Sequence, residues 1–364
     1  MPRLTDVGTD ALRLVMHCLD SAQLLQLATC CRATLIAAQS DFAWRHSLLR
    51  VASNTQGLPK LLKGSLIRHA SIHLSLVLSQ KFVIHQPSAA MDAVVLRVLR
   101  PCGSRLRGFD AALSRYIPLL CWQTILADAC LSSLRVLRLG SAEIAAQCNE
   151  AMLEAICGGM QSLTKLDLRL FEPRSDIWGP LADARALRTL SIVATDAVQS
   201  HHYGLPPLAP NVTRLQLTGI LHLFPLFTRF IDSPVLSQLS ELTLGDLPSN
   251  PAIWFEQFWI QLLACRVVHL FRVCKIDACI AFAHQAPVLR ALRITPTDDF
   301  AADWVPSSDA VCALLRAAPE LIVTLVIPPL AGRPRSVETR ARRFDDAKSE
   351  FPSRCVLVLQ SGPS

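Results

Sequence analysis

A six-residue pattern of apolar residues, L-x-x-L-x-L, recurs through most of this 364-residue chain. The middle residues of successive copies are 21 to 33 residues apart. The second and third apolar positions are two residues apart, which on a β-strand directs both side chains to one face. The pattern therefore predicts a series of short strands, each buried on one side. The copies are Leu134-Leu137-Leu139, Leu163-Leu166-Leu168, Leu187-Leu190-Ile192, Val212-Leu215-Leu217, Leu239-Leu242-Leu244, Val268-Phe271-Val273, Leu289-Leu292-Ile294 and Ile322-Leu325-Ile327.

The segments between the copies predict helices. Residues 149–157 carry a helical stripe of apolar side chains, and Gly158-Gly159 is expected to end that helix in the left-handed conformation. Pro210, Pro287 and Pro319 each precede the next copy and disfavour helix in the residue before them. A strand and a helix repeated at such a period are the signature of a leucine-rich repeat. The expected fold class is α/β, a leucine-rich-repeat solenoid (horseshoe) preceded by a small all-α domain.

Four regions are predicted along the chain. Residues 1–50 form three short helices, and residues 51–130 form irregular N-terminal repeats that include an alternating strand at Ile72-Leu74-Leu76-Leu78. Residues 131–330 form the leucine-rich repeats. Residues 331–364 form a C-terminal cap, with a helix over 336–350 and a strand over 355–359, because the exposed end of a solenoid needs covering.

The composition excludes several classes of protein. Apolar residues make up 51% and charged residues 18%, which excludes an intrinsically disordered chain. The thirteen cysteines include no C-x-x-C pair, so we interpret them as reduced, mostly buried apolar residues and expect no metal. Neither a signal sequence nor a membrane-spanning run is evident, which predicts a cytoplasmic or nuclear protein.

The first fifty residues do not follow the repeat. A segment this short has more apolar side chains than it can bury alone, which favours a docking element. It resembles an F-box over about 40 residues, although Val7-Gly8 stands where that family has Leu-Pro and Thr34 where it usually has an aromatic residue. The matching residues are Leu12, Val15, Leu19, Gln23-Leu24-Leu25, Cys31-Arg32, Asp41 and Trp44-Arg45.

The resemblance implies the substrate-recognition subunit of an SCF-type (cullin-RING) ubiquitin ligase. In that family the F-box binds the adaptor subunit, and through it the cullin, while the repeats hold a protein substrate. Such a protein is not an enzyme and needs no cofactor, because it contributes only proximity. By this resemblance the adaptor-binding residues are Leu12, Val15, Leu19, Leu24, Leu25, Cys31 and Trp44.

The outward-facing strand positions predict the substrate-binding surface on the concave face. Basic residues outnumber acidic ones there, which favours an acidic or phosphorylated protein substrate; scattered surface charge is the alternative. The residues are Arg138, Lys165, Asp167, Arg169, Arg214, Gln216, Glu241 and Arg293.

The sequence allows alternative interpretations of the aromatic residues and of the function of the chain. The aromatic cluster Trp254-Phe255 and Phe258-Trp259 is either a ligand anchor or core packing. The whole chain is alternatively a leucine-rich-repeat interaction scaffold unconnected with ubiquitin. Nucleic-acid binding is disfavoured because basic clusters are scarce and only two Tyr are present. No nucleotide-binding, zinc-protease or serine-hydrolase motif occurs, which disfavours an enzyme.

Overall fold

The computed structural model describes residues 48–51, 72–76, 88–112, 117, 119–140, 150–169, 179–194, 209–219, 221, 224–247, 252–273, 276–295, 306–327 and 341–359. The chain divides into two compact units, unit 1 up to Leu187 and unit 2 from Arg188 onward. The predicted N-terminal helices, and with them all seven adaptor-binding residues, lie outside the described residues.

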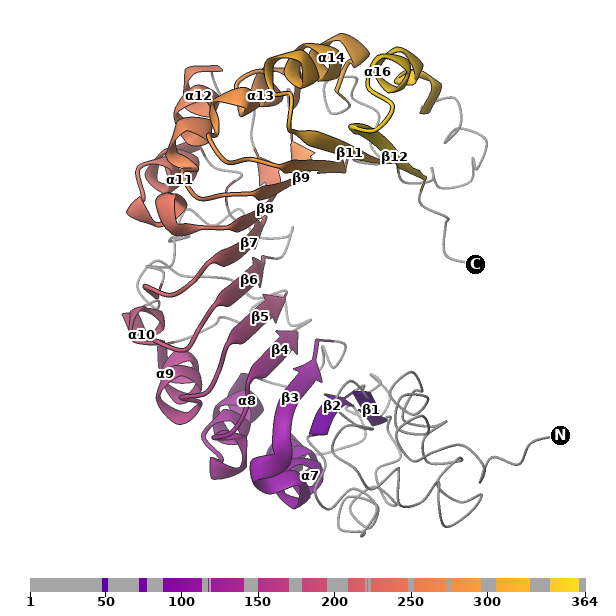
Figure 1. Cartoon of the computed structure of the whole chain (residues 1–364). Helices are drawn as coiled ribbons and strands as arrows, with labels where there is room; N and C mark the ends of the chain where they lie inside the picture. Colours follow the sequence, from indigo (N-terminus) through magenta and orange to yellow (C-terminus); the bar gives the residue numbers. More distant parts are fainter. Residues whose placement is uncertain are drawn as a thin grey trace, which may run out of the picture. The chain divides into compact units, whose positions relative to one another are not determined.

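Unit 1 contains parallel strands that are hydrogen-bonded in chain order. Helices α7, α8 and α9 lie along one face of these strands (Figure 1). The strands are β1 (Leu48–Val51), β2 (Ile72–Leu76), β3 (Leu106–Ala111), β4 (Val136–Gly140) and β5 (Lys165–Arg169). The helices are α7 (Ser88–Leu99), α8 (Leu119–Leu126), α9 (Glu150–Gly159) and α10 (Gly179–Ala182), with 3-10 turns η3 (Arg100–Arg105) and η4 (Ala129–Leu131).

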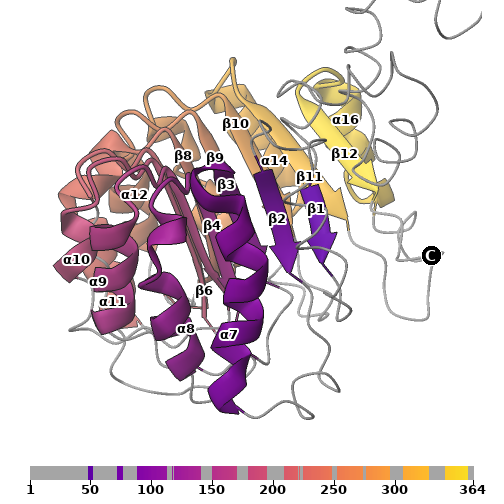
Figure 2. The ribbon, with the colours of Figure 1, turned by 90° about the horizontal axis from the view of Figure 1, so that it is seen from below.

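Unit 2 repeats this arrangement, with parallel strands in chain order and its helices on one face (Figure 2). Its strands are β6 (Thr189–Val193), β7 (Arg214–Thr218), β8 (Glu241–Leu247), β9 (Val267–Val273), β10 (Ala291–Thr295), β11 (Ile322–Ile327) and β12 (Cys355–Leu359). Its helices are α11 (Phe224–Ile231), α12 (Ala252–Gln261), α13 (Ile276–Ile280), α14 (Ser308–Ala317) and α16 (Asp345–Glu350), with 3-10 turns η5 (Pro234–Gln238) and η6 (Ala283–Gln285).

A tight turn closed by a buried apolar residue precedes β4 to β11. The amide of that residue, which we call the anchor, donates a hydrogen bond to the carbonyl three residues earlier, as Leu134 does to Leu131 at 3.0 Å. The anchor side chain is buried beneath the sheet, and the strand begins one or two residues later. The chain therefore enters each of these strands through the same kind of turn. The anchors are Leu134, Leu163, Leu187, Val212, Leu239, Cys265, Leu289 and Leu321.

The core lies between the sheet and the helices. In unit 1 the rings of Phe109 and Trp122 pack with centroids 6.3 Å apart. In unit 2, Phe258 meets Trp259 edge to face at 5.0 Å, and both are completely buried. The indole Nε1–H of Trp259 donates to the carbonyl of Cys279 at 2.6 Å. Phe255, Phe258 and Trp259 of the aromatic cluster on α12 are therefore core packing, whereas Trp254 is half-exposed.

For two copies of the apolar pattern, the predicted inward-facing residues are wrong. The first is the sixth copy, on β9. The pairing of β8 with β9 aligns Leu242 with Val268 and Leu244 with Leu270, so the sixth copy is Cys265-Val268-Leu270. Arg272 has a positive φ of 55°, which breaks the two-residue alternation. As a result Phe271 and Val273 do not share a face, as Phe271 is half-exposed and Val273 is buried.

The last predicted copy is also shifted. Leu292 pairs with Val323 and Ile294 with Leu325, so the inward residues of β11 are Val323 and Leu325. Ile322 lies on the opposite face and is exposed. The anchor Leu321 is only two residues from Val323, one fewer than in the other units, and this shortening hid the correct alignment.

The predicted fold class, a leucine-rich-repeat solenoid behind a small all-α domain, is wrong. The described residues form an all-parallel α/β sheet with interspersed helices, whose lengths range from the four residues of α10 to the twelve of α7. The pattern L-x-x-L-x-L requires only a buried anchor and two inward strand residues. Any parallel sheet with helices packed on one face meets that requirement, so the pattern identifies strand–helix units and not the class of repeat.

Smaller predictions had mixed outcomes. The strands at Ile72–Leu76 and Cys355–Leu359 are confirmed, whereas β1 and β3 were missed. Gly158 and Gly159 do not end α9 in the left-handed conformation, since both lie inside the helix and neither has a positive φ. None of the helices in the described ranges combines the length and apolar character needed to cross a membrane.

Gly140 is required by a close backbone approach at the end of β4. A Cβ atom there would overlap the carbonyl oxygen of Ala112, which belongs to the backbone and has little freedom to move. We expect Gly140→Ala to lower the free energy of unfolding by about 1–3 kcal/mol. The measurement is chemical unfolding followed by circular dichroism.

Gly158 provides the matched control in the same unit. It lies inside α9, and a Cβ atom there would meet nothing within 4 Å. Gly158→Ala should leave stability unchanged or raise it by up to about 1 kcal/mol, because alanine favours helix. Equal destabilisation by the two substitutions would contradict the close approach at Gly140.

Candidate ligand-binding face

In each unit the strands present one face that no described helix covers, which we call the open face (Figures 1 and 2). Cross-strand pairing aligns its side chains in rows. In unit 1 one row runs Ser75, Asp110, Arg138 and Asp167 across β2 to β5. In unit 2 the corresponding row is Ser191, Gln216, Thr243, His269, Arg293 and Thr324 across β6 to β11. All eight predicted substrate-binding residues lie on these strands, at open-face positions.

The row in unit 1 is an ionic network. Arg138 Nη1 lies 3.2 Å from Asp110 Oδ2, and Arg138 Nε lies 3.9 Å from Asp167 Oδ2. Arg169 donates to the same carboxylate of Asp167 through Nε and Nη2, at 3.1 and 3.0 Å. The Asp167 side chain is only 4% exposed. The hydrogen bonds that Arg169 donates to Asp167 raise the pKa of the Arg169 guanidinium, which therefore stays charged at neutral pH.

Asp110 belongs to this network, although it is not among the residues predicted for this face. Its carboxylate accepts the amide of Ala112 at 3.1 Å as well as the Arg138 guanidinium. A signal was present, because Leu106, Phe109 and Ala111 are all buried and follow the same spacing as the apolar pattern. An alanine in the third position concealed it.

In unit 2 the predicted residues are arranged differently. Arg214 Nη2 pairs with Glu241 Oε1 at 3.0 Å, and both side chains are largely exposed. Gln216 and Thr243 are half-exposed neighbours on β7 and β8. Arg293 is exposed, and the described residues place no carboxylate or hydrogen-bond acceptor against it. The structure therefore distinguishes Arg214, which is paired, from Arg293, which has no described carboxylate against it.

Next to this region two residues share an unusual backbone. Asp246 and Arg272 have φ of 59° and 55°, and they occupy aligned positions between Gly245–Phe271 and Leu247–Val273. Left-handed backbone costs a non-glycine residue roughly 1–2 kcal/mol. The Arg272 Nε–Asp246 Oδ1 ion pair, at 2.8 Å, holds the two side chains together. The guanidinium of Arg272 is thus engaged with Asp246 and also lies over the Phe271 ring.

His269 lies between Thr243 and Arg293 in the same row. Burial, together with the smaller effect of the neighbouring positive charge of Arg293, lowers its pKa to about 4. Its Nε2 lies 2.9 Å from Thr295 Oγ1. The imidazole is therefore neutral at physiological pH and adds no charge to the open face.

The predicted basic stripe is largely neutralised. Arg138 and Arg169 are paired with Asp110 and Asp167, and Arg214 is paired with Glu241. Lys165 is half-exposed and aligned with Val136. Arg293 differs from these three paired arginines, because its charge is not matched by a described carboxylate.

The described cysteines are poorly suited to nucleophilic chemistry. Burial raises the pKa of Cys102, Cys157 and Cys265 to about 12, which keeps these thiols protonated at neutral pH. Six of the eight described cysteines are buried, and all eight are free. Within the described ranges no group of three or more His, Cys, Asp or Glu side chains is placed to hold a metal ion.

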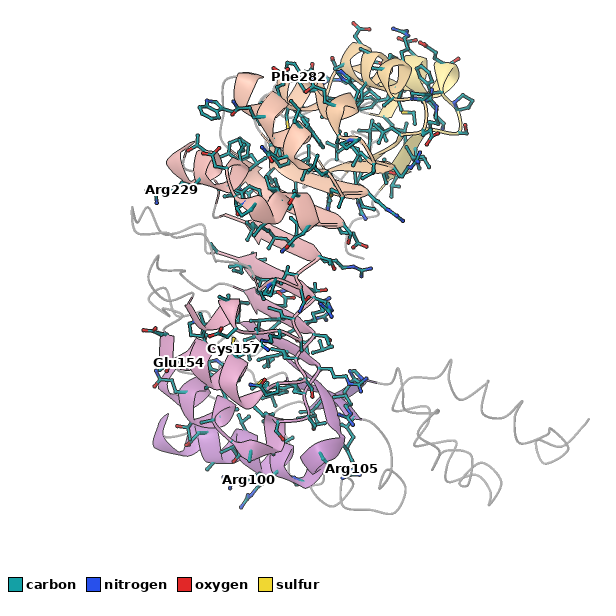
Figure 3. The ribbon with its side chains drawn as sticks, turned by 60° about the vertical axis from the view of Figure 1, so that its left-hand side comes forward. Arg100, Arg105, Glu154, Cys157, Arg229 and Phe282 are labelled. Atoms are coloured by element: carbon teal, nitrogen blue, oxygen red, sulfur yellow. The ribbon has the colours of Figure 1, made fainter. Side chains whose placement is uncertain are left out.

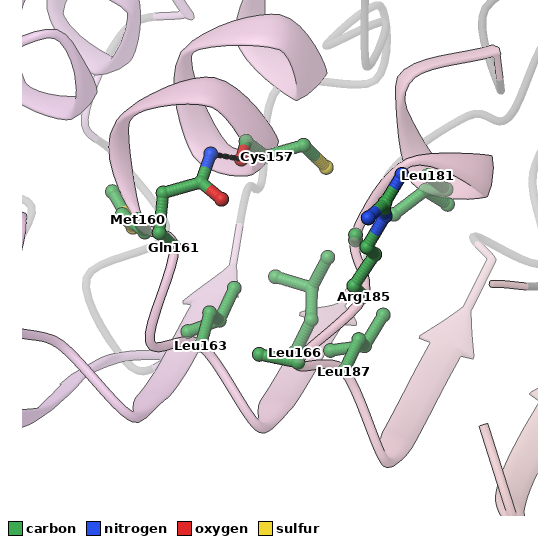
Figure 4. Close-up of a pocket in the computed structure, with 10 residues that line it drawn as sticks. Cys157, Met160, Gln161, Leu163, Leu166, Leu181, Arg185 and Leu187 are labelled. Atoms are coloured by element: carbon green, nitrogen blue, oxygen red, sulfur yellow. Dashed lines mark hydrogen bonds between the residues drawn. The ribbon is translucent and has the colours of Figure 1, made fainter. Parts of the chain in front are cut away.

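A small hollow in unit 1 lies beneath β5, between α9 and α10 (Figure 4). Its wall is mainly apolar, with Leu163, Leu166 and Leu187 along one side and Cys157 on the other. Gln161 Nε2 closes the α9 side by donating to the carbonyl of Cys157 at 3.1 Å. A volume of about 10 Å³ gives room for a single water at most. The hollow is a packing defect and not a substrate site.

The helical layer carries ordinary surface charge. Arg100, Glu154 and Arg229 are exposed on it (Figure 3). Arg100 Nη2 pairs with Asp128 Oδ2 at 2.9 Å. These helical charges form no arrangement comparable with the rows of the open face, which remains the candidate site.

The fold and the open face together define an α/β protein whose parallel strands present ordered rows of side chains on a face that no described helix covers. No protein-family model matches the chain, and no curated protein matches it significantly.

Asp167 provides a test of the ionic network. Asp167→Asn removes the negative charge that faces Arg138 and Arg169 while keeping the shape of the side chain. Because buried hydrogen bonds to charged groups are worth about 1.5–3 kcal/mol, we expect a comparable loss in the free energy of unfolding. Glu241→Gln is the matched control, since exposed pairs contribute about 0–1 kcal/mol. If the two substitutions cost the same in chemical unfolding, the network is no stronger than an ordinary surface pair.

His269 provides a test of pH dependence. Its pKa is about 4 in the folded chain, against 6.5 for an ordinary histidine, so the unfolded chain binds the proton more readily between these values. The contribution of His269 is therefore fully present above pH 6.5 and is lost as the pH falls towards 4. Between pH 7 and pH 5 the wild type should lose more stability than His269→Gln in urea unfolding. Parallel pH profiles of the two proteins would contradict the low pKa.

Proposed function

We propose that this protein is a non-catalytic binding subunit that holds a protein ligand on its open face. The observation that carries this proposal is the row of side chains on each open face, fixed in position by neighbouring strands. Asp167 between two arginines, and His269 against Thr295, are held before any ligand arrives. Preorganised side chains lose less conformational entropy on binding, which favours a recognition surface.

We further propose that the ligand is a substrate of an SCF-type ubiquitin ligase. The support comes from the F-box-like segment, in which Leu24 and Leu25 follow the spacing of that family. In this role the N-terminal segment binds the ligase adaptor, and the open face brings the substrate to the ubiquitin-transfer machinery. Rate enhancement then comes from proximity alone.

The test of this role is adaptor binding by the full-length chain. We expect the purified adaptor subunit to bind the wild-type protein in a pull-down and by calorimetry. Leu24→Asp and Leu25→Asp should each weaken binding at least about 10-fold, because a charge buried in an apolar interface costs more than 1.4 kcal/mol.

Gln26→Asp is the matched control, as it places the same charge off the predicted apolar stripe. Circular dichroism checks that the three variants keep the wild-type secondary structure. Trp44→Ala adds a variant that introduces no charge, and it should also weaken binding. The proposed ligase role is wrong if the wild-type chain binds no adaptor. It is also wrong if Leu24→Asp, Leu25→Asp and Trp44→Ala all bind the adaptor as tightly as the wild type does.

A further inference from the structure

Exposed apolar side chains gather on the open face at the C-terminal end of unit 2. Val267, Ile322, Val356 and Val358 are 37%, 42%, 38% and 40% exposed. Among the described residues only six large apolar side chains are exposed, and these four all lie on β9, β11 and β12. A concentration of this kind on one surface marks an interaction site more often than single exposed residues do.

The strand register places a charged centre within this group. Arg293 on β10 is aligned with His269 on one side and with Thr324 and then Val356 on the other. Val267 and Ile322 flank Ala291, two residues before Arg293 on the same strand. With strands about 4.8 Å apart, all of these lie within roughly 10 Å of Arg293 along the sheet. We call this group the β9–β12 surface.

Arg293 differs from the neighbouring arginines, which already have described partners. Arg272 is paired with Asp246 at 2.8 Å, and Arg290 is paired with Glu320. Arg354 donates to the carbonyls of Leu315 and Ala318 at 2.9 and 3.1 Å. Strands β9 to β12 themselves carry two described arginines, Arg272 and Arg293, and of these two only Arg272 is paired with a described carboxylate.

The neighbours of Arg293 define what kind of anion fits. His269 is neutral, so a ligand meets a single positive charge, with the hydroxyl groups of Thr295 and Thr324 beside it. A phosphoryl group carries about 1.5 to 2 negative charges and would be undercompensated on a surface that is otherwise apolar. A carboxylate carries one charge, and a guanidinium can bind it through two parallel hydrogen bonds.

We propose that the β9–β12 surface binds a short segment of a partner protein in which one Asp or Glu lies between apolar side chains. The carboxylate pairs with Arg293, and the apolar side chains cover Val267, Ile322 and Val356. From β9 to β12 the sheet spans about 14 Å, which an extended segment of four or five residues covers. The inference rests on the proposed binding function and names the chemistry of the ligand.

The test uses a display library of random nine-residue peptides, selected on the full-length chain. We expect the selected peptides to be enriched in Asp or Glu with apolar residues on both sides. A synthetic peptide from that pool should bind Arg293→Gln at least about 10-fold more weakly than the wild type, because it loses a charge-assisted hydrogen bond. Arg316→Gln, which changes an arginine on helix α14 already paired with Glu350, should bind as the wild type does.

A second pair of variants tests the apolar part. Ile322→Asp places a negative charge on the β9–β12 surface and should abolish binding. Leu263→Asp is the control and should leave binding unchanged, because Leu263 is an equally apolar residue, 54% exposed, that follows α12 and is not on a strand. Arg293→Glu should reverse the preference of the library from acidic to basic peptides. A role of Arg293 in folding alone would not produce that reversal.

The proposal fails if acidic residues are not enriched, or if the selected peptide binds Arg293→Gln as tightly as the wild type. It also fails if replacing the acidic residue with phosphoserine tightens binding 10-fold or more, because the surface is then a phosphate site. These results are independent of adaptor binding. If the chain binds the peptide but no adaptor, the β9–β12 surface is supported and the ligase role is wrong. If it binds the adaptor but no such peptide, the ligase role is supported and the β9–β12 proposal is wrong.

Discussion

The buried anchor in the turn before each strand is the interaction on which the structure depends. Its amide closes the turn and its side chain is buried under the sheet, so position and direction of the strand are fixed together. Once the strand is fixed, its alternating side chains divide between the core and the open face. The placement of Arg138 beside Asp110, or of Arg293 beside His269, follows from anchors that are buried beneath the sheet.

The sequence was sufficient to predict most of the strands, because the anchor and the two inward residues form a local pattern. Leu137 and Leu139 of β4, for example, are buried as expected. The prediction failed where the backbone departed from regular alternation. Arg272 has a left-handed conformation and Leu321 is one residue closer to its strand, and neither change is visible in an apolar pattern. The fold class was wrong because the same local pattern satisfies any one-sided parallel sheet.

The candidate site was predictable as a set of positions but not as a set of interactions. Alternation placed Arg138, Arg214 and Arg293 on the open face correctly. Which of them is neutralised depends on the residue across from it on the next strand, and that register is set by tertiary structure. Asp110 and His269 were missed for this reason, although they decide where positive charge remains. A list of exposed charges therefore overstated the basic character of the face.

The shared left-handed backbone of Asp246 and Arg272 has a consequence for how this protein can evolve. Each residue has an unfavourable backbone conformation and their side chains form an ion pair, so replacing one removes that ion pair from a position that is already strained. Neither position can drift freely by itself. Substitutions there are expected to arrive as compensated pairs, which makes this pair of strands a more reliable marker of shared ancestry than the interchangeable leucines of the core.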